Sequence, residues 1–169
     1  MTATDAVAEM VEAARAADSA ASYAVAPASA LPFDDERFPL VVAYNVLMDV
    51  DDLSGTLSEL RRVIQPGGRL MMSVVHPLID RGETCDERFL LSGDWFATLR
   101  FEGREEIDGL AMDFAGWARP LPTYVEALRA AGFALTALRE PQPDPGPLPA
   151  RLERARRVPI FAWMAAEPH

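Results

Sequence analysis

The sequence predicts an α/β protein with a doubly wound, mostly parallel sheet and an antiparallel last strand. Two observations predict the class. Apolar runs of strand length alternate with segments of helical periodicity along the chain. The run 38–44 is almost entirely apolar, as expected for a strand that is covered on both faces. A third observation concerns the end of the chain, where a short connection joins the last two strands and allows the final one to run antiparallel.

Composition indicates a single soluble domain. The chain has 169 residues, of which half are hydrophobic and a quarter charged, which is enough for one domain with a core. No apolar run approaches the roughly 20 residues of a membrane helix, and the first residues lack the pattern of a secretory signal. The single cysteine, Cys85, excludes an internal disulfide and fits the reducing cytoplasm, where we expect the protein to act.

The charge pattern favours a small-molecule partner. The net charge is −10, whereas a protein that binds nucleic-acid backbones normally carries a basic stripe. The one basic cluster comprises Arg151, Arg154, Arg156 and Arg157, and we interpret it as a solvated helix face. Two histidines and the absence of an acidic ligand loop predict no metal site.

Near the N-terminus, Thr2–Thr4 is expected to end a strand and Ser22–Ala26 to form another. Between them we expect a helix over Val7–Ala17, because alanine favours helices and apolar residues recur on one side. The residues of that side are Val7, Met10, Val11 and Ala14. Asp5 stands just before this helix and is a candidate N-cap.

The middle of the chain repeats the alternation. Residues 27–35 are expected to form a loop and Phe38–Tyr44 a buried strand. A helix is predicted from Leu53 to Ile64, ended by Pro66-Gly67-Gly68 with a glycine in the left-handed C-cap position. Arg69–Val75 is the next predicted strand.

The C-terminal half continues the pattern after an interruption. Residues 78–118 contain several glycines and two tryptophans, and we interpret them as an inserted cap of short strands and loops within one domain spanning 1–169. A helix is then expected over Pro122–Ala131, with proline in its first turn, and a strand over Phe133–Arg139. The stiff loop 141–149, a short helix and the strand Pro159–Ala165 complete the chain.

Five sequence blocks, in this order, resemble class I S-adenosylmethionine-dependent methyltransferases of the type 11 kind. They are DAVAEMVEAAR, ALPF, LVVAYNVLMDV, ELRRVIQPGGRLMMSVVHP and RPLPTYVEALRAAGF, the last followed by LREPQP. The Pro-Gly-Gly block after the ELRRV helix is the most specific. The resemblance implies a Rossmann-like fold, S-adenosylmethionine as cofactor and methyl transfer to a small-molecule acceptor.

The resemblance also implies cofactor contacts at three strand ends. Asp5 would bind the ribose hydroxyls through its carboxylate, with Ala6 beside the adenine ring. Further implied contacts are Ala28 and Ser29 at the adenine edge, and Tyr44, Asn45 and Val46 near the sulfonium and amino-acid part. An N-cap role for Asp5 and a plain turn role for Asn45 stay open.

The segment after the fifth family strand and the inserted segment usually bind the acceptor in such enzymes. The corresponding residues here are His76, Trp95, Phe96, Trp117, Arg119 and Tyr124. Structural roles stay open for each: His76 as a turn cap and weak catalytic candidate, the aromatic residues as core, and Arg119 in a salt bridge. Methyl transfer needs a base only when the acceptor must lose a proton, so no catalytic dyad is required.

Two departures from the family pattern bear on activity. The family's opening helix, first strand and Gly-rich turn have no counterpart here, and Pro27 stands where the family has an acid. The family's first strand is central, so its absence would leave sheet edges unpaired. We therefore expect a truncated form or a fragment, unless the strands close the gap or a homodimer or partner chain covers the edge.

Two alternative functions remain. The chain could be a non-catalytic remnant that binds or regulates a partner chain, which the missing Gly turn and Pro27 would favour. A nicotinamide-dependent oxidoreductase is disfavoured because the phosphate-binding turn is absent and the chain contains no lysine.

Overall fold

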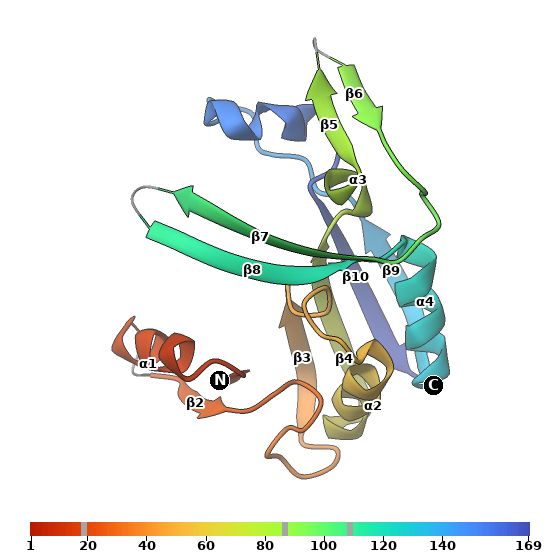
Figure 1. The fold of residues 1–169 in the computed structure, drawn as a ribbon. Helices are drawn as coiled ribbons and strands as arrows, with labels where there is room; N and C mark the ends of the chain where they lie inside the picture. The colour runs from red at the N-terminus through yellow and green to blue at the C-terminus, as the bar shows by residue number, and fades with distance from the viewer. Residues whose placement is uncertain (18–19, 86–87, 108–109) are drawn as a thin grey trace.

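A four-stranded mixed sheet, in the order β3-β4-β10-β9, forms the body of the protein (Figure 1). The structure, a computed structural model, describes residues 1–17, 20–85, 88–107 and 110–169. The strands of this sheet are β3 (Phe38–Tyr44), β4 (Ile64–Val75), β9 (Phe133–Arg139) and β10 (Phe161–Pro168). β3 and β4 run parallel, whereas β10 is antiparallel to both of its neighbours.

Two helices cover one face of this sheet and create the core. They are α2 (Leu53–Val63) and α4 (Leu121–Ala130), which also contact each other (Figure 1). Leu57 of α2 and Leu128 of α4 are fully buried against Leu70 and Val74 of β4 and Met164 of β10. Alternate residues of a strand point to the same side of the sheet, so every second residue of each strand contributes an apolar side chain to this face.

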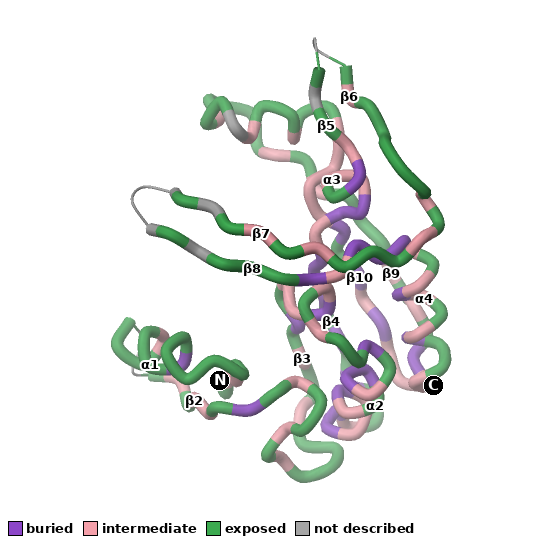
Figure 2. Tube along the Cα trace, in the orientation of Figure 1, coloured by how far each residue is buried: buried purple, intermediate pink, exposed green. Residues whose placement is uncertain are grey.

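The opposite face of the sheet is largely open to solvent (Figure 2). Leu40, Val42 and Tyr44 of β3 alternate on this face and are each at least half exposed. Their neighbours across the sheet are Met71, which pairs with Val42, and Trp163, which pairs with Ser73. Both of those side chains are also exposed. The prediction that Phe38–Tyr44 is covered on both faces is therefore wrong, because the described residues leave this apolar row uncovered.

β1 (Thr2–Asp5) and β2 (Ser22–Val25) form a separate two-stranded parallel sheet. The helix α1 (Ala8–Ala17) connects them and packs beside them through Val11, which is the buried residue of the helix. Val7 and Met10, which the sequence placed on the same side of this helix, are exposed. Among the described residues, no strand pairing joins this sheet to β3.

Two hairpins extend from the body between β4 and α4. A single-turn helix, α3 (Pro77–Asp80), follows β4 and leads into the hairpin of β5 (Gly82–Cys85) and β6 (Arg88–Leu91). β7 (Leu99–Ile107) and β8 (Leu110–Ala118) form the second hairpin. A short 3-10 helix, η1 (Ala150–Arg156), precedes β10.

The α/β class and the antiparallel last strand are confirmed, but the sheet differs from the predicted one. The four-stranded sheet is mixed, not mostly parallel, and helices cover one of its faces. The β1–β2 sheet stays separate from it, as expected if the family's central strand is missing. The predicted glycine C-cap of the middle helix is also wrong. The helix ends at Val63, and Ile64 is already extended because its side chain is fully buried and its backbone pairs with Phe38. Gly67 adopts φ 74° three residues later, within β4, where the register with β3 shifts between the Ile64 and Arg69 pairs.

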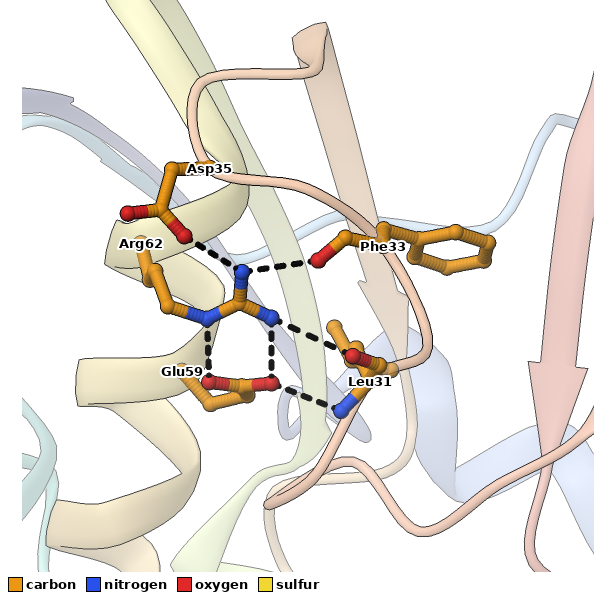
Figure 3. A network of polar contacts seen from close by, with 5 residues as sticks. All are labelled: Leu31, Phe33, Asp35, Glu59 and Arg62. Carbon is orange, nitrogen blue, oxygen red and sulfur yellow. Dashed lines mark hydrogen bonds and ion pairs between the residues drawn. The ribbon is translucent and has the colours of Figure 1, made fainter.

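Arg62 of α2 holds the segment between β2 and β3 (Figure 3). Its guanidinium donates to the carbonyls of Phe33 (2.7 Å) and Leu31 (3.2 Å) and to the Asp35 carboxylate (2.7 Å). It also donates two bonds to Glu59, at 2.8 and 2.7 Å. Glu59 in turn accepts from the Leu31 amide at 2.7 Å, and the Arg62 bonds hold the pKa of this carboxyl below its ordinary value.

Replacing Arg62 with Lys tests how much this network contributes to stability. Lysine keeps the charge but cannot donate in the forked geometry, so several of these acceptors lose their partner. We expect the free energy of unfolding, measured by urea denaturation, to fall clearly below that of wild type. Arg129→Lys, on the exposed side of α4, is the control and should leave it within the error of the measurement. Equal stability of the two variants would contradict the assignment.

Candidate functional site

The carboxyl ends of β1 and β2 lie side by side. The Asp5 carbonyl accepts a hydrogen bond from the Ala26 amide at 2.9 Å, which continues the parallel pairing to the ends of both strands. Beyond Ala26 the chain turns, and the Ala30 amide donates to the Pro27 carbonyl at 3.0 Å. The parallel pairing therefore brings the predicted adenine contacts at residues 28–29 to the same edge as Asp5.

The Asp5 carboxylate is exposed and only partly engaged. Its Oδ1 accepts a hydrogen bond from the Val7 amide at 2.8 Å, just before α1 begins. This bond closes a turn ahead of the helix, whose first backbone bond is accepted by Val7, so Asp5 is not the N-cap that the sequence left open, and the turn uses one of its two carboxylate oxygens. Ala6 and Ser29 are exposed beside this edge, and Ala28 is half-buried.

Asn45 ends β3 in a left-handed conformation. Its φ is 51°, which asparagine tolerates better than most residues. Its amide donates to the Ser73 carbonyl, and its side-chain oxygen accepts from the Ser73 hydroxyl, both at 2.9 Å. The side chain is therefore fixed to β4, between the exposed Tyr44 and the half-buried Val46.

The loop after Asn45 is held by the end of β8. The Trp117 amide donates to the Met48 carbonyl at 2.9 Å. The Arg119 guanidinium, which is buried, donates to the carbonyls of Leu47 (3.0 Å) and Val50 (2.7 Å). These contacts join the predicted acceptor-binding residues Trp117 and Arg119 to the loop that follows the predicted cofactor-binding residues.

Two guanidinium groups lie close to the Trp117 ring. The Arg100 and Arg119 guanidinium carbons each lie 5.3 Å from its ring centre. Its indole N–H donates to Asp51 at 2.9 Å, and Arg100 donates to the same oxygen at 2.8 Å. The Trp117 bond, with Arg100 beside it, lowers the pKa of Asp51. The half-buried indole is thus fixed by polar contacts near the surface and is not part of the core, the structural role that the sequence left open for it.

Tyr124 is buried beneath this group. Burial raises the pKa of its phenol to about 12, so the hydroxyl stays protonated at neutral pH although Arg119 lies near it. Burial also raises the pKa of Asp49. The absence of a side chain at Gly116 lets the Asp49 carboxylate lie against the backbone of β8, because a Cβ at Gly116 would lie 3.0 Å from one of its oxygens.

His76 caps α3 at the end of β4. Its Nδ1 accepts from the Leu78 amide at 3.2 Å, so the neutral ring carries its proton on Nε2, which lies 3.1 Å from Glu140. The ring is buried, and burial lowers its pKa although Glu140 opposes the shift. The turn-capping role of His76 is therefore observed.

Arg81 is a buried residue that the sequence did not single out. It donates to the carbonyls of Ala97 and Ala118, the latter at 2.8 Å, and its guanidinium lies 5.7 Å from the Trp95 ring. Phe96, the neighbour of Trp95, is largely exposed. Arg81 thus connects three separate segments, a role that a lone arginine in a loop does not reveal in a sequence.

The structure brings together one set of the predicted acceptor-binding residues. Trp117, Arg119 and Tyr124 form one cluster, whereas His76 pairs with Glu140 and Trp95 with Arg81.

In the part of the chain that the structure describes, no group of three or more metal-binding side chains occurs. No helix in the same residues has the length and apolar character needed to cross a membrane.

The chain resembles known methyltransferases in sequence. Residues 1–72 match the family described as "Methyltransferase domain". YafE, an uncharacterized protein of Escherichia coli K12, is 31% identical over 122 residues, covering 60% of this chain and 58% of YafE. The matched regions span between 20% and 58% of the length of the curated relatives.

Solved structures share the fold. A protein of Listeria monocytogenes classed as an S-adenosylmethionine-dependent methyltransferase superposes with a TM-score of 0.78 at 18% identity, covering 99% of this chain and 79% of that one. The Burkholderia thailandensis 1,6-didemethyltoxoflavin-N1-methyltransferase, solved with 1,6-didemethyltoxoflavin and S-adenosylhomocysteine, gives 0.57 at 17% identity, covering 99% and 60%. The predicted resemblance is thereby confirmed.

The pH dependence of stability tests the environment of His76. Its pKa is lower in the folded chain than the usual value near 6.5, so the unfolded chain binds the proton first as pH falls. The stabilisation is present above about pH 6.5 and is lost below it. His76→Asn keeps an acceptor for the Leu78 amide. We expect urea denaturation between about pH 7.5 and 5.5 to show a smaller loss of stability in this variant than in wild type.

The difference between the two proteins is the informative quantity, because other groups also titrate. Asp80, whose pKa burial raises to about 6, changes stability in the opposite direction, since its stabilisation is lost as pH rises. That contribution is common to wild type and variant. Identical pH slopes in the two would contradict the account of His76.

Proposed function

We propose that this chain, a class I S-adenosylmethionine-dependent methyltransferase in fold and, over residues 1–72, in sequence, transfers a methyl group from S-adenosylmethionine to a small-molecule acceptor. One observation carries the proposal. The exposed Asp5 carboxylate ends β1 beside the 26–29 turn of β2, and it keeps an oxygen that no described residue engages. In open α/β sheets, ligands bind at the carboxyl ends of the strands.

At this edge the Asp5 carboxylate suits the ribose of the cofactor, whereas Pro27 does not suit its adenine. A carboxylate accepts two hydroxyl hydrogen bonds, as the ribose diol requires, and charge-assisted bonds are the stronger kind. Pro27 offers neither a side-chain acceptor nor an N–H, so the adenine amino group would have to find its partner elsewhere. Ala28 and Ser29 are proposed to lie along the adenine edge, and Ala6 beside the ring.

The end of β3 is proposed to hold the other half of the cofactor. Tyr44, Asn45 and Val46 are the residues that would lie near its amino-acid part. Asn45 is fixed in its left-handed conformation by two hydrogen bonds, one from its amide to the Ser73 carbonyl and one from the Ser73 hydroxyl to its side chain, so the backbone of this turn is preorganised for a ligand. The Burkholderia neighbour was solved with S-adenosylhomocysteine and a small acceptor, which supports this assignment of ligand classes.

Methyl transfer from an activated donor requires few catalytic side chains from the protein. The bound cofactor would supply an activated methyl group, and the protein has to align the acceptor and exclude water. We propose that residues 78–118 form a cap within a single domain that does so, anchored by the contacts of Trp117, Arg119 and Arg81. Trp95 and Tyr124 are proposed to line the acceptor side.

His76 is the candidate for moving a proton when the acceptor must lose one. Burial keeps its imidazole neutral at physiological pH, and the carboxylate of Glu140 beside Nε2 would stabilise the ring if it became charged. The neutral ring carries its proton on Nε2 and has its one lone pair on Nδ1, so to take a proton from the acceptor it would first have to release the Leu78 amide. The assignment rests on the buried pair and on its position at the end of β4.

A second candidate function is a non-catalytic subunit that binds a partner chain. The observation that favours it is the outer edge of β3, which no strand of the described residues pairs, together with the exposed side chains of Leu40, Val42 and Tyr44. Unpaired edges with apolar side chains invite another strand. We propose that a strand from outside these residues, supplied by a second copy or by another chain, pairs with this edge.

Asp5→Asn tests the cofactor assignment. Asparagine keeps an oxygen for the Val7 amide but removes the charge that would bind the ribose. We expect S-adenosylhomocysteine affinity, measured by calorimetric titration, to fall roughly tenfold or more. Glu9→Gln in the first turn of α1 removes the same charge nearby and should leave affinity unchanged. Equal affinities for wild type and Asp5→Asn would contradict the assignment of Asp5.

Sedimentation equilibrium tests the proposed strand pairing. If β3 pairs with a second copy, the chain should sediment as a dimer, and Val42→Lys should shift it to monomer because a charge replaces an exposed apolar side chain at the edge. Ser58→Lys on the exposed side of α2 adds the same charge and should have no effect. A wild-type monomer at every concentration would rule out pairing between copies.

A further inference from the structure

A basic cavity lies beyond the carboxyl end of β4. It has a volume of about 720 Å³, within the range of ligand pockets, and it is lined by residues of the β5–β6 hairpin and of the η1 segment. Both elements lie at the same end of the molecule in Figure 1. The hairpin contributes Arg88 and Phe89, and the η1 segment contributes Arg154, Arg157 and Val158. Two elements far apart in the sequence therefore build its walls.

The two wall elements of this cavity are both joined to the sheet at the carboxyl end of β4, near His76 of the candidate site. The hairpin follows α3, which His76 caps directly after β4. The η1 segment leads into β10, whose first residue, Phe161, pairs with Val75, and the His76 amide donates to the Ile160 carbonyl at 2.7 Å. The cavity is thus on the acceptor side proposed above.

The charge of the cavity is opposite to that of the protein. Four arginines and two glutamates line it, whereas the whole chain carries a net charge of −10. Arg156 is paired with Glu153 at 3.0 Å. Arg88, Arg154 and Arg157 form no ion pair with any described residue, although they are exposed on the cavity walls. The sequence predicted that the arginines of residues 151–157 form a solvated helix face. In the structure Arg154, Arg156 and Arg157 also line a cavity, together with Arg88 from the hairpin.

The cavity also has an apolar part. The Phe89 ring lies across Gly82, where an added Cβ would come within 2.1 Å of the ring, so glycine is needed for the ring to lie there. Ala150 and Val158 contribute apolar surface on the η1 side. Guanidinium groups beside an aromatic ring recognise an anion attached to an apolar body.

We propose that this cavity binds the anionic group of the methyl acceptor, a carboxylate or a phosphate carried on an aromatic or aliphatic body. The inference rests on the proposed function for the identity of the ligand as an acceptor, but the anion site itself does not. Arg88 on one wall and Arg154 and Arg157 on the other donate to the anion, and Phe89 packs against the apolar body.

Calorimetric titration with phenyl phosphate, benzoate and benzyl alcohol tests this site in the full chain. We expect one of the two anions to bind and the uncharged alcohol not to. The stronger anion identifies the group as phosphate or carboxylate. The Arg154→Gln/Arg157→Gln variant should weaken its binding roughly fivefold or more, and Arg88→Gln should weaken it from the other wall. Circular dichroism verifies that each variant is folded.

The control is Arg37→Gln/Arg129→Gln, which lowers the charge equally at exposed positions away from the cavity and should leave binding unchanged. No binding of either anion, or equal weakening by the control, would overturn the proposal. Titration of the same samples with S-adenosylhomocysteine separates the two claims. Arginine-dependent anion binding without S-adenosylhomocysteine binding would contradict only the proposed function, and the reverse would contradict only the cavity assignment.

Discussion

The Arg62 guanidinium is the contact on which the arrangement of the candidate site depends. The β1–β2 sheet shares no strand pairing with the four-stranded sheet among the described residues, so the segment from Ala26 to Arg37 must set its position. Arg62 and Glu59 fasten that segment to α2 through its backbone as well as through Asp35. Because α2 packs on the core face of β4, the network relates the Asp5 edge to the end of β3.

A second set of arginine contacts has the same effect on the acceptor side. Arg119 donates to two carbonyls of the loop that follows β3, and Arg81 donates to Ala118 at the end of β8 and to Ala97 in the loop before β7. Buried guanidinium groups need such acceptors, since an unpaired buried charge is costly. A residue that looks like a substrate ligand in sequence can thus be a positioning residue, and Arg119, with two carbonyl partners, is an example.

The sequence predicted the bounds of two strands but not the burial of one of them. β3 and β9 agree with the predicted runs 38–44 and 133–139, because apolar and β-branched residues favour strands, but β3 is not covered on both faces as its apolar run predicted. The end of α2 was wrong because a tertiary contact, the burial of Ile64 against the sheet, replaced the local glycine signal. The site contacts of Arg62 and Arg81, and the cavity shared by Arg88 and η1, join residues distant in sequence, and no local pattern predicts such contacts.

The central claim is that the cofactor binds across the ends of β1, β2 and β3. The most direct test is a nitrogen-15 NMR titration of the chain with S-adenosylhomocysteine, which reports on each backbone amide. The largest chemical-shift changes are expected at the amides of Asp5–Val7, Ala28–Ser29 and Asn45–Val46, at the three strand ends whose relative position depends on the Arg62 network. A folded spectrum without shifts, or with shifts confined to other regions, would contradict it.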